Sequence, residues 1–115
     1  MIAVIFEVEL ADGRMDQYLT LATALCGELE TIDGFLSVER FQSMSTPNRM
    51  VSLSFSRDEQ AVQQWRNTSA HRATQARGRA GIFTNYRLRV AGVIRDYGMV
   101  DRVQAPADSV AVHST

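Results

Sequence analysis

The stretch FLSVERFQSMSTPNRMVSLSFS, residues 35–56, decides the fold of this chain. Residues 35–43 and 49–56 each show the alternation and the aromatic and β-branched content that are typical of β-strands. The link between them contains Pro47 and Asn48, which are turn-forming residues. Because the link is short, the two strands are predicted to form an antiparallel hairpin.

An amphipathic helix precedes the hairpin. Apolar residues recur at three- and four-residue steps from Met15 to Leu29. Asp12 is placed to cap the start of this helix, and Gly34 suits a left-handed position at its end. Cys26 lies on the apolar stripe, where we interpret it as a small buried side chain because no activating base is evident.

A second helix follows the hairpin. Ser56 or Asp58 can cap it, and Ala61 and Trp65 share one of its faces. The letters NTS at 67–69 offer a new cap. The helix is therefore expected to bend or restart at this point.

Strands are also predicted at both ends of this central part, over residues 1–9 and 82–97, the latter with a possible bulge near Gly92. The resulting order, βαββαβ, is an α+β, ferredoxin-like fold: a four-stranded antiparallel sheet with both helices on one face. We predict one domain over residues 1–98. Residues 99–115 form a C-terminal tail, either mobile or an arm that pairs with a partner chain through SVAV.

The face of the sheet that lacks helices presents a problem. By alternation it carries five apolar residues: Ile5, Phe35, Phe41, Ala91 and Val93. Such a patch rarely stays exposed on a monomer. A two-fold homodimer with the sheets face to face, a dimeric α/β barrel, solves the problem.

The mixed faces of the strands then line an interior cleft sized for a flat organic molecule. Their residues are Ile5, Glu7, Ser37, Glu39, Phe41, Ser52, Ser54, Arg87 and Arg89. Glu and Arg on neighbouring strands can pair across the sheet. The alternative is that these charges lie at the sheet ends, solvated or paired.

Composition excludes several classes of function. The 115 residues carry a net charge of −1, which gives no strong field to attract nucleic acid or an acidic membrane. No apolar run approaches the ~20 residues of a membrane span. The sequence opens without a signal-peptide pattern and has one cysteine, so we expect a cytoplasmic protein. Two distant histidines and one cysteine give no metal-ligand spacing.

Three segments, GFLSVERF, LSFSRDEQAVQQWRN and AHRATQARGR, in this order within a βαββαβ pattern, resemble the antibiotic biosynthesis monooxygenase domain family. The resemblance covers about residues 2–98. It implies a dimeric α/β barrel. The family includes oxygenases that oxidise aromatic polyketides without metal or flavin, haem-degrading enzymes, and proteins with no known activity.

In the cofactor-free members the substrate supplies the electrons, and the protein binds it, favours its anion and admits oxygen. The resemblance therefore implies a monooxygenase that needs no cofactor and oxidises an aromatic or quinone-like molecule with molecular oxygen. Haem binding or degradation stays open. The haem-degrading branch, however, has an asparagine on the first strand, where this chain has Glu7 and Val8, and its histidine ligand would fall near Gln75. A non-catalytic small-molecule-binding or stress-response dimer also stays open.

Trp65 and His71 are the leading site candidates. Trp65 is either a core aromatic or a wall of the substrate pocket. His71 is either a partly exposed residue or a general base, since a neutral imidazole with a pKa of about 6.5 can take a phenolic proton near neutral pH. Glu39, Ser54 and Arg89 are predicted to be polar contacts to the substrate.

Overall fold

The computed structural model describes residues 1–68, 72–73, 76 and 81–112 of the chain. The chain forms four strands and three described helices. In order they are β1 (Ile2–Leu10), α1 (Met15–Leu29), β2 (Phe35–Gln42), β3 (Arg49–Ser56), α2 (Glu59–Arg66), β4 (Phe83–Gly92) and α4 (Ala107–Val112).

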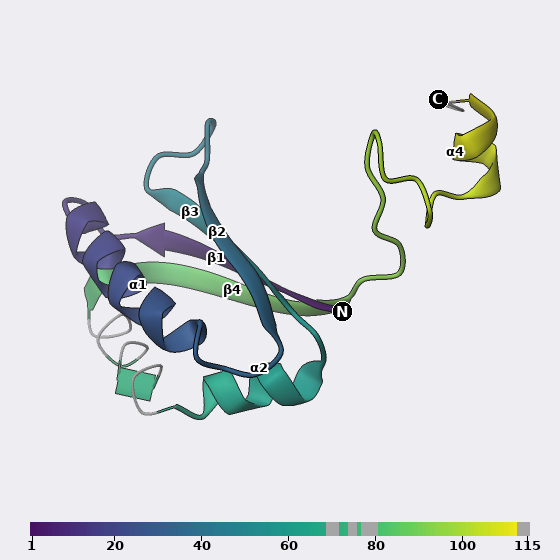
Figure 1. Ribbon diagram of the computed structural model, residues 1–115. Coiled ribbons are helices and arrows are strands. Elements are labelled where there is room, and N and C mark those ends of the chain that lie inside the picture. The colour runs from purple at the N-terminus through teal and green to yellow at the C-terminus, as the bar shows by residue number, and fades with distance from the viewer. Residues whose placement is uncertain (69–71, 74–75, 77–80, 113–115) are drawn as a thin grey trace.

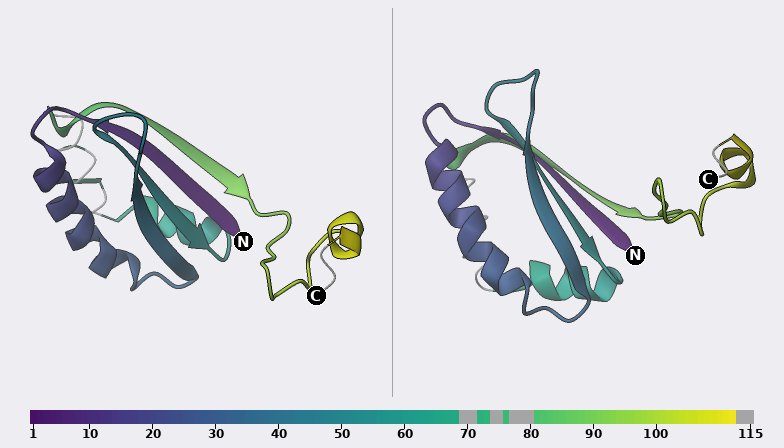
Figure 2. Two further views of the ribbon diagram at one scale, coloured as in Figure 1. Left: turned by 90° about the horizontal axis from the view of Figure 1, so that it is seen from above. Right: turned by 45° about the horizontal axis from the view of Figure 1, so that its top comes forward.

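The four strands form one antiparallel sheet in the order β2-β3-β1-β4. Helices α1 and α2 both cover the same face of this sheet, and the opposite face carries no helix (Figures 1 and 2). This arrangement confirms the predicted α+β, ferredoxin-like fold.

Some predicted boundaries shift. Strand β4 ends at Gly92 rather than at residue 97, and the irregularity in its pairing lies opposite, between Glu9 and Leu10 of β1. Helix α2 ends at Arg66, where a break was predicted. The predicted restart of the helix falls largely outside the described residues.

The helix ends have identifiable causes. The Ala61 N–H donates to Asp58 Oδ1 over 2.9 Å, so Asp58, rather than the alternative Ser56, caps α2. Asp12 does not cap α1, whose N-cap position is Arg14; the Asp12 carboxylate instead accepts a 2.7 Å hydrogen bond from Asn48. Gly34, with φ of +91°, takes the left-handed conformation expected after α1, and a Cβ there would lie 3.0 Å from the Ala61 Cβ.

The register of β3 corrects the predicted faces of the sheet. Ser52 pairs with Phe6, and Ser54 pairs with Val4. Because directly paired residues share a face, the serines point toward the helices and not to the mixed face with Glu7 and Arg89. The prediction took the apolar side of β3 as the core side, and that assumption was wrong.

The apolar side of β3 therefore lies on the helix-free face. There Val51 pairs with Glu7, Leu53 with Ile5, and Phe55 with Ala3. The predicted cross-strand pairing of Glu and Arg occurs on this face, between Glu7 and Arg89 at 2.9 Å and between Glu9 and Arg49 at 2.7 Å. Phe35, which was expected here, is in register with Ser56 across a bulge.

The tightly packed core occupies one end of the space between sheet and helices. Its buried members are Val8, Leu10, Tyr18, Ala22, Met50 and Ile82. Each comes from the half of its element nearest the start of α1, or from the loop that leads into β4. The other half of the interlayer space is less completely filled, and the candidate site lies there.

The C-terminal tail projects from the domain (Figures 1 and 2). The Cα radius of gyration is 16.6 Å, whereas a compact chain of this length has about 13 Å. Within the tail, the Arg102 guanidinium stacks 5.2 Å from the centre of the Tyr97 ring and donates to Ser109 Oγ over 2.9 Å. The SVAV segment, predicted to pair as a strand in one alternative, is part of the helix α4.

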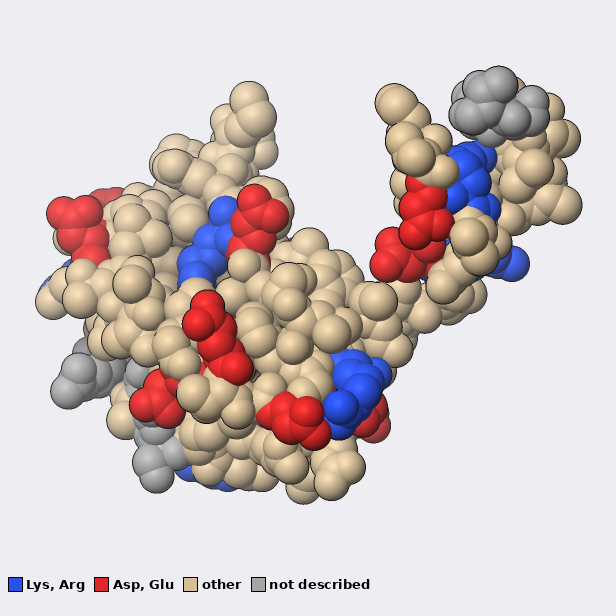
Figure 3. All heavy atoms as spheres, in the orientation of Figure 1, with Lys and Arg blue, Asp and Glu red and all other residues tan. Residues whose placement is uncertain are grey.

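Charges of both signs are interspersed over the face shown in Figure 3, as the near-zero net charge leads one to expect. Within the described ranges, no helix has the length and apolar character that crossing a membrane requires.

Removing the α2 cap provides a test of the fold. The Ala61 N–H and the Arg57 guanidinium hold the pKa of Asp58 below its usual value. A depressed folded-state pKa means that this contribution is complete above the ordinary carboxyl pKa of about 3.9 and is lost as pH falls through the lower folded-state value. We expect Asp58→Ala to lower the melting temperature at pH 7, and Asp58→Asn to retain most of the stability.

Thermal unfolding followed by circular dichroism from pH 7 to pH 3 checks this expectation. The gap between wild type and Asp58→Ala should narrow as pH falls below about 3.9. A gap that widens at acidic pH would contradict the capping role.

Candidate functional site

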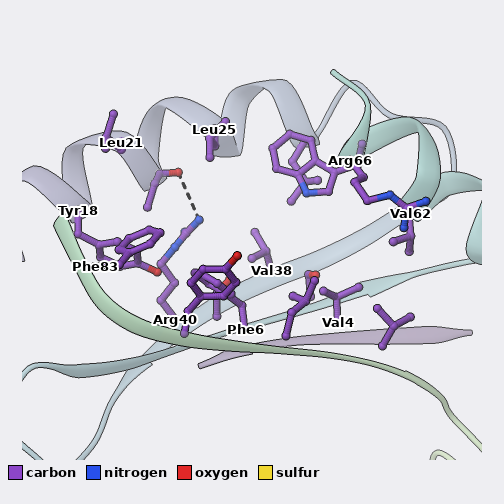
Figure 4. Close-up of a pocket in the computed structure, with 18 residues that line it drawn as sticks. Val4, Phe6, Tyr18, Leu21, Leu25, Val38, Arg40, Val62, Arg66 and Phe83 are labelled. Atoms are coloured by element: carbon purple, nitrogen blue, oxygen red, sulfur yellow. Dashed lines mark hydrogen bonds between the residues drawn. The ribbon is translucent and has the colours of Figure 1, made fainter. Parts of the chain in front are cut away.

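A cavity lies between the sheet and the two helices, in the half of the interlayer space that the core leaves open (Figure 4). All four strands and both helices contribute to its lining. The lining residues are Val4, Phe6, Tyr18, Leu21, Ala22, Leu25, Leu29, Val38, Arg40, Ser52, Ser54, Val62, Trp65, Arg66, Phe83, Tyr86, Leu88 and Val90.

The cavity has a volume of about 160 Å³. An engineered protein cavity of about 150 Å³ is large enough to bind benzene. The space therefore accepts one six-membered ring or an aliphatic group of similar size. A tricyclic molecule would have to extend beyond it.

One wall of the cavity is aromatic. The Phe6 ring centroid lies 5.8 Å from that of Phe83 and 5.6 Å from that of Tyr86. Phe83 is also 6.1 Å from Tyr18 in an edge-on arrangement. These distances fall in the range of favourable ring contacts, so the four rings support one another and offer a bound ring both edges and faces.

The sheet side of the cavity carries the serines of β3. Ser52 lies between Phe6 and Arg40, its paired neighbours on β1 and β2, and Ser54 lies between Val4 and Val38. Serine is much smaller than the valine or leucine that a packed core would place here. The serine face of β3 therefore leaves room for the cavity and adds hydroxyl groups to its surface.

Arg40 is the charged side chain that crosses the interlayer space. It extends from β2 to α1, where Nη2 donates to the Ala22 carbonyl oxygen over 3.3 Å (Figure 4). Its Nη1 donates to Cys26 Sγ over 3.5 Å. Arg40 Nε is buried and has no hydrogen-bond partner among the described residues. Both named acceptors are neutral, so the guanidinium retains an uncompensated positive charge.

Tyr18, on α1, adds a hydroxyl group beside Arg40. Burial raises the pKa of Tyr18 above its ordinary value, and the charge and hydrogen bond of Arg40 partly oppose this effect. The Tyr18 phenol therefore stays protonated at neutral pH and acts as a hydrogen-bond donor or acceptor.

The structure brings together two of the five residues predicted from the sequence. Trp65 and Ser54 both line the cavity. Glu39 pairs with Leu53, and Arg89 pairs with Ile5, so both lie on the helix-free face of the sheet. His71 lies outside the described residues.

The sequence interpretation missed Arg40 and Tyr18. The predicted placement of Glu39 and Phe41 on the helix-free side of β2 already put Val38 and Arg40 on the side of the helices, and an arginine on that otherwise apolar face was the available signal. Tyr18 was recognised only as part of the apolar stripe of α1. Within the described residues, no three His, Cys, Asp or Glu side chains gather as metal ligands would.

These features define a class: a ferredoxin-like α+β domain with a mainly apolar cavity, suited to a small organic molecule, between its helices and its sheet. Residues 1–77 match the family described as antibiotic biosynthesis monooxygenase. The chain belongs to the antibiotic biosynthesis monooxygenase family, as its sequence pattern predicted.

A relative named jasmonate monooxygenase ABM, from Pyricularia oryzae, is 45% identical over 93 residues. The matched part covers 81% of this chain and 43% of the relative, so the chain spans less than half of the relative's length.

Solved structures share the fold at low sequence identity. Rv0793 from Mycobacterium tuberculosis superposes with a TM-score of 0.75 at 15% identity, covering 84% of this chain and 98% of that one. A mutant of SnoaB, a cofactor-independent oxygenase from Streptomyces nogalater, gives a TM-score of 0.73 at 8% identity, covering 83% and 94%.

Filling the cavity from the serine side provides a test of the site. We expect Ser54→Leu to weaken binding of phenol, a one-ring probe, by about tenfold or more, equivalent to about 1.4 kcal/mol, because the larger side chain takes up cavity volume. Trp65 is the chain's only tryptophan and lines the cavity, so its fluorescence reports binding. Ser37→Leu, on the opposite face, is the matched control. Equal phenol affinity in a folded Ser54→Leu variant would refute this location for the site.

Proposed function

We propose that this protein is a cofactor-independent monooxygenase that oxidises a small cyclic organic molecule with molecular oxygen. In such a reaction a ring methylene takes one oxygen atom and becomes a carbonyl. The other oxygen atom leaves as water with the two hydrogens of the methylene. The substrate itself supplies the electrons.

The observation that carries this proposal is the cavity. It is largely apolar, has an aromatic wall and is crossed by the Arg40 side chain, with Arg66 also in its lining. A cleft filled by side chains would have favoured a non-catalytic module. The open volume of about 160 Å³ supports a ligand-binding role instead.

The comparisons give further support. A 45% identical relative carries the name jasmonate monooxygenase, and a structural neighbour is described as a cofactor-independent oxygenase. Jasmonate is a monocyclic ketone with a carboxylate side chain, and its ring matches the size of the cavity better than a three-ring polyketide does. The size argument therefore favours a monocyclic substrate.

Within this proposal, Trp65 forms part of the wall and Ser54 a polar contact. His71 serves as the general base that removes the acidic proton of the substrate. The described lining residues include neither a carboxylate nor a histidine, so the described wall offers no competing base of these types. Glu39 and Arg89 have no part in binding at the cavity, because they lie on the other face of the sheet.

Oxygen uptake tests the activity and the role of His71. We expect uptake above the buffer rate with a substrate that carries a ring methylene, using anthrone and jasmonate as separate trials. His71→Ala should lower the rate by about a hundredfold or more, the usual contribution of a general base. An oxygen electrode measures the rate, and mass spectrometry with labelled O₂ confirms that an oxygen atom enters the product.

His113 is the chain's other histidine, so His113→Ala is the matched control and should keep the wild-type rate. Equal rates for wild type and His71→Ala would remove the histidine from the mechanism. No uptake with either substrate would count against oxygenase activity on this substrate class.

We also propose that the protein is a homodimer. The helix-free face presents Ile5, Val51, Leu53 and Phe55, all half-buried in the single chain, and Phe41, which is 46% exposed. A second copy would cover these side chains. The projecting tail adds Val100 and Val103, both more than 90% exposed, as a further surface for a partner chain.

A charge placed on this face tests the dimer. We expect the wild type to sediment as a dimer and Leu53→Glu to sediment as a monomer, since an unpaired buried carboxylate is strongly unfavourable in an interface. Met44→Glu is the control, because Met44 is fully exposed in the β2–β3 loop. A Leu53→Glu variant that remains dimeric in the ultracentrifuge would exclude this interface.

A further inference from the structure

We propose that Arg40 makes the cavity a selective site for organic anions. The apolar body of the ligand, about one ring in size, lies against the aromatic wall, and its negatively charged oxygen lies at the Arg40 guanidinium. This inference rests on the function proposed above only in taking the same cavity as the substrate site. It concerns binding and does not require turnover.

The charge of Arg40 has no counter-charge among the described residues. All 13 acidic residues belong to the described residues, and the ion pairs found there join other arginines: Arg49 to Glu9, Arg57 to Asp33 and Asp58, and Arg89 to Glu7. A carboxylate therefore does not neutralise Arg40, although two other arginines on the sheet have such partners.

The surroundings make an unpaired charge costly. The cavity lining near Arg40 is mainly aliphatic and aromatic, and a charge removed from water in such a setting is unfavourable unless it is paired and hydrogen-bonded. The guanidinium has five N–H donors. Arg40 donates to the Ala22 carbonyl oxygen and to Cys26 Sγ and is also hydrogen-bonded to the Tyr18 side chain, whereas Nε is buried without a partner among the described residues. The site therefore has both unused charge and unused donors.

An anionic ligand would supply the negative charge and the hydrogen-bond acceptors that Arg40 lacks. A carboxylate accepts hydrogen bonds from a guanidinium in a matched planar geometry, and a phenolate or enolate accepts them through one oxygen. The protonated Tyr18 hydroxyl stands beside Arg40 as a second donor. A neutral ligand of the same shape would fill the apolar wall equally well but would leave the arginine charge uncompensated.

Matched pairs of ligands test the proposal on the full-length protein. The first pair is phenylacetate and phenylacetamide, and the second is 4-nitrophenolate and 4-nitroanisole, each above the pKa of its acid. We expect the anion to bind about ten- to a hundredfold more tightly than its neutral partner in at least one pair, since hydrogen bonds between charged groups are stronger than neutral ones. Isothermal titration calorimetry gives the dissociation constants, and the pair that discriminates identifies a carboxylate or a phenolate as the preferred anion.

Variants of Arg40 then assign the preference. Arg40→Met should reduce the ratio of the two dissociation constants to near one, and Arg40→Lys should keep part of it. Because the ratio compares two ligands on one protein, a general loss of stability in a variant cancels. Arg87→Met, on the helix-free face, is the matched control and should keep the wild-type ratio.

Equal affinities for anion and neutral ligand in both wild-type pairs would overturn the proposal. A preference for the anion that persists in Arg40→Met would also overturn the proposal. If the preference persists in Arg40→Met but is lost in Arg66→Met, the anion is bound by Arg66 at the cavity rim instead. A preference for the anion without oxygen uptake would leave this inference standing and count against oxygenase activity on the substrates tested. Oxygen uptake without a preference for the anion would support the oxygenase function and overturn this inference.

Discussion

The structure depends on the orientation of one strand, β3, which turns its serines toward the helices and its apolar residues away from them. Small polar side chains beneath a helix layer leave volume unfilled, and large apolar side chains on a helix-free face leave area uncovered. The cavity under the helices and the uncovered apolar surface on the opposite face of the sheet therefore have the same cause, which is the orientation of β3. Ser52 lies on the helix-covered face beside the cavity, and the adjacent residue Val51 lies on the helix-free face.

The division of the interlayer space into a packed end and an open end affects stability as well as binding. Val8 is fully buried and anchors the packed end, where Leu10 and Met50 lie beside it. Most residues around the cavity are partly buried or exposed, and Arg40 helps to hold β2 to α1 through two long hydrogen bonds. Regions with few buried contacts open at a lower free-energy cost than the core does. The end of the domain that admits a ligand is therefore also the end best able to adjust around one.

The sequence was sufficient to predict the four strands, the helices α1 and α2 and their order, with Asp58 as one of two candidate caps, because periodicity and turn chemistry are local properties. It did not predict the short helix α4 in the tail. It was not sufficient to predict which face of β3 points inward. Alternation determines which residues share a face, but the inward direction depends on the pairing of β3 with β1. The interpretation assumed that the apolar side of a strand is the core side. That assumption fails for a sheet whose outer face is also apolar.

The alternation of side chains along β2 and β3 also separates the two proposed properties, ligand binding and dimer formation, onto opposite faces of the sheet. On β3 the side chains of Ser52 and Ser54 face the cavity, whereas Leu53 between them faces the helix-free side. The same holds on β2, where Arg40 faces the cavity and Glu39 does not. A ligand in the cavity and a second copy of the chain would contact opposite sides of the same two strands without sharing a side chain. A shift of β3 by one residue would exchange both sets at once, so the pairing that creates the cavity must be the same pairing that creates the outer apolar face.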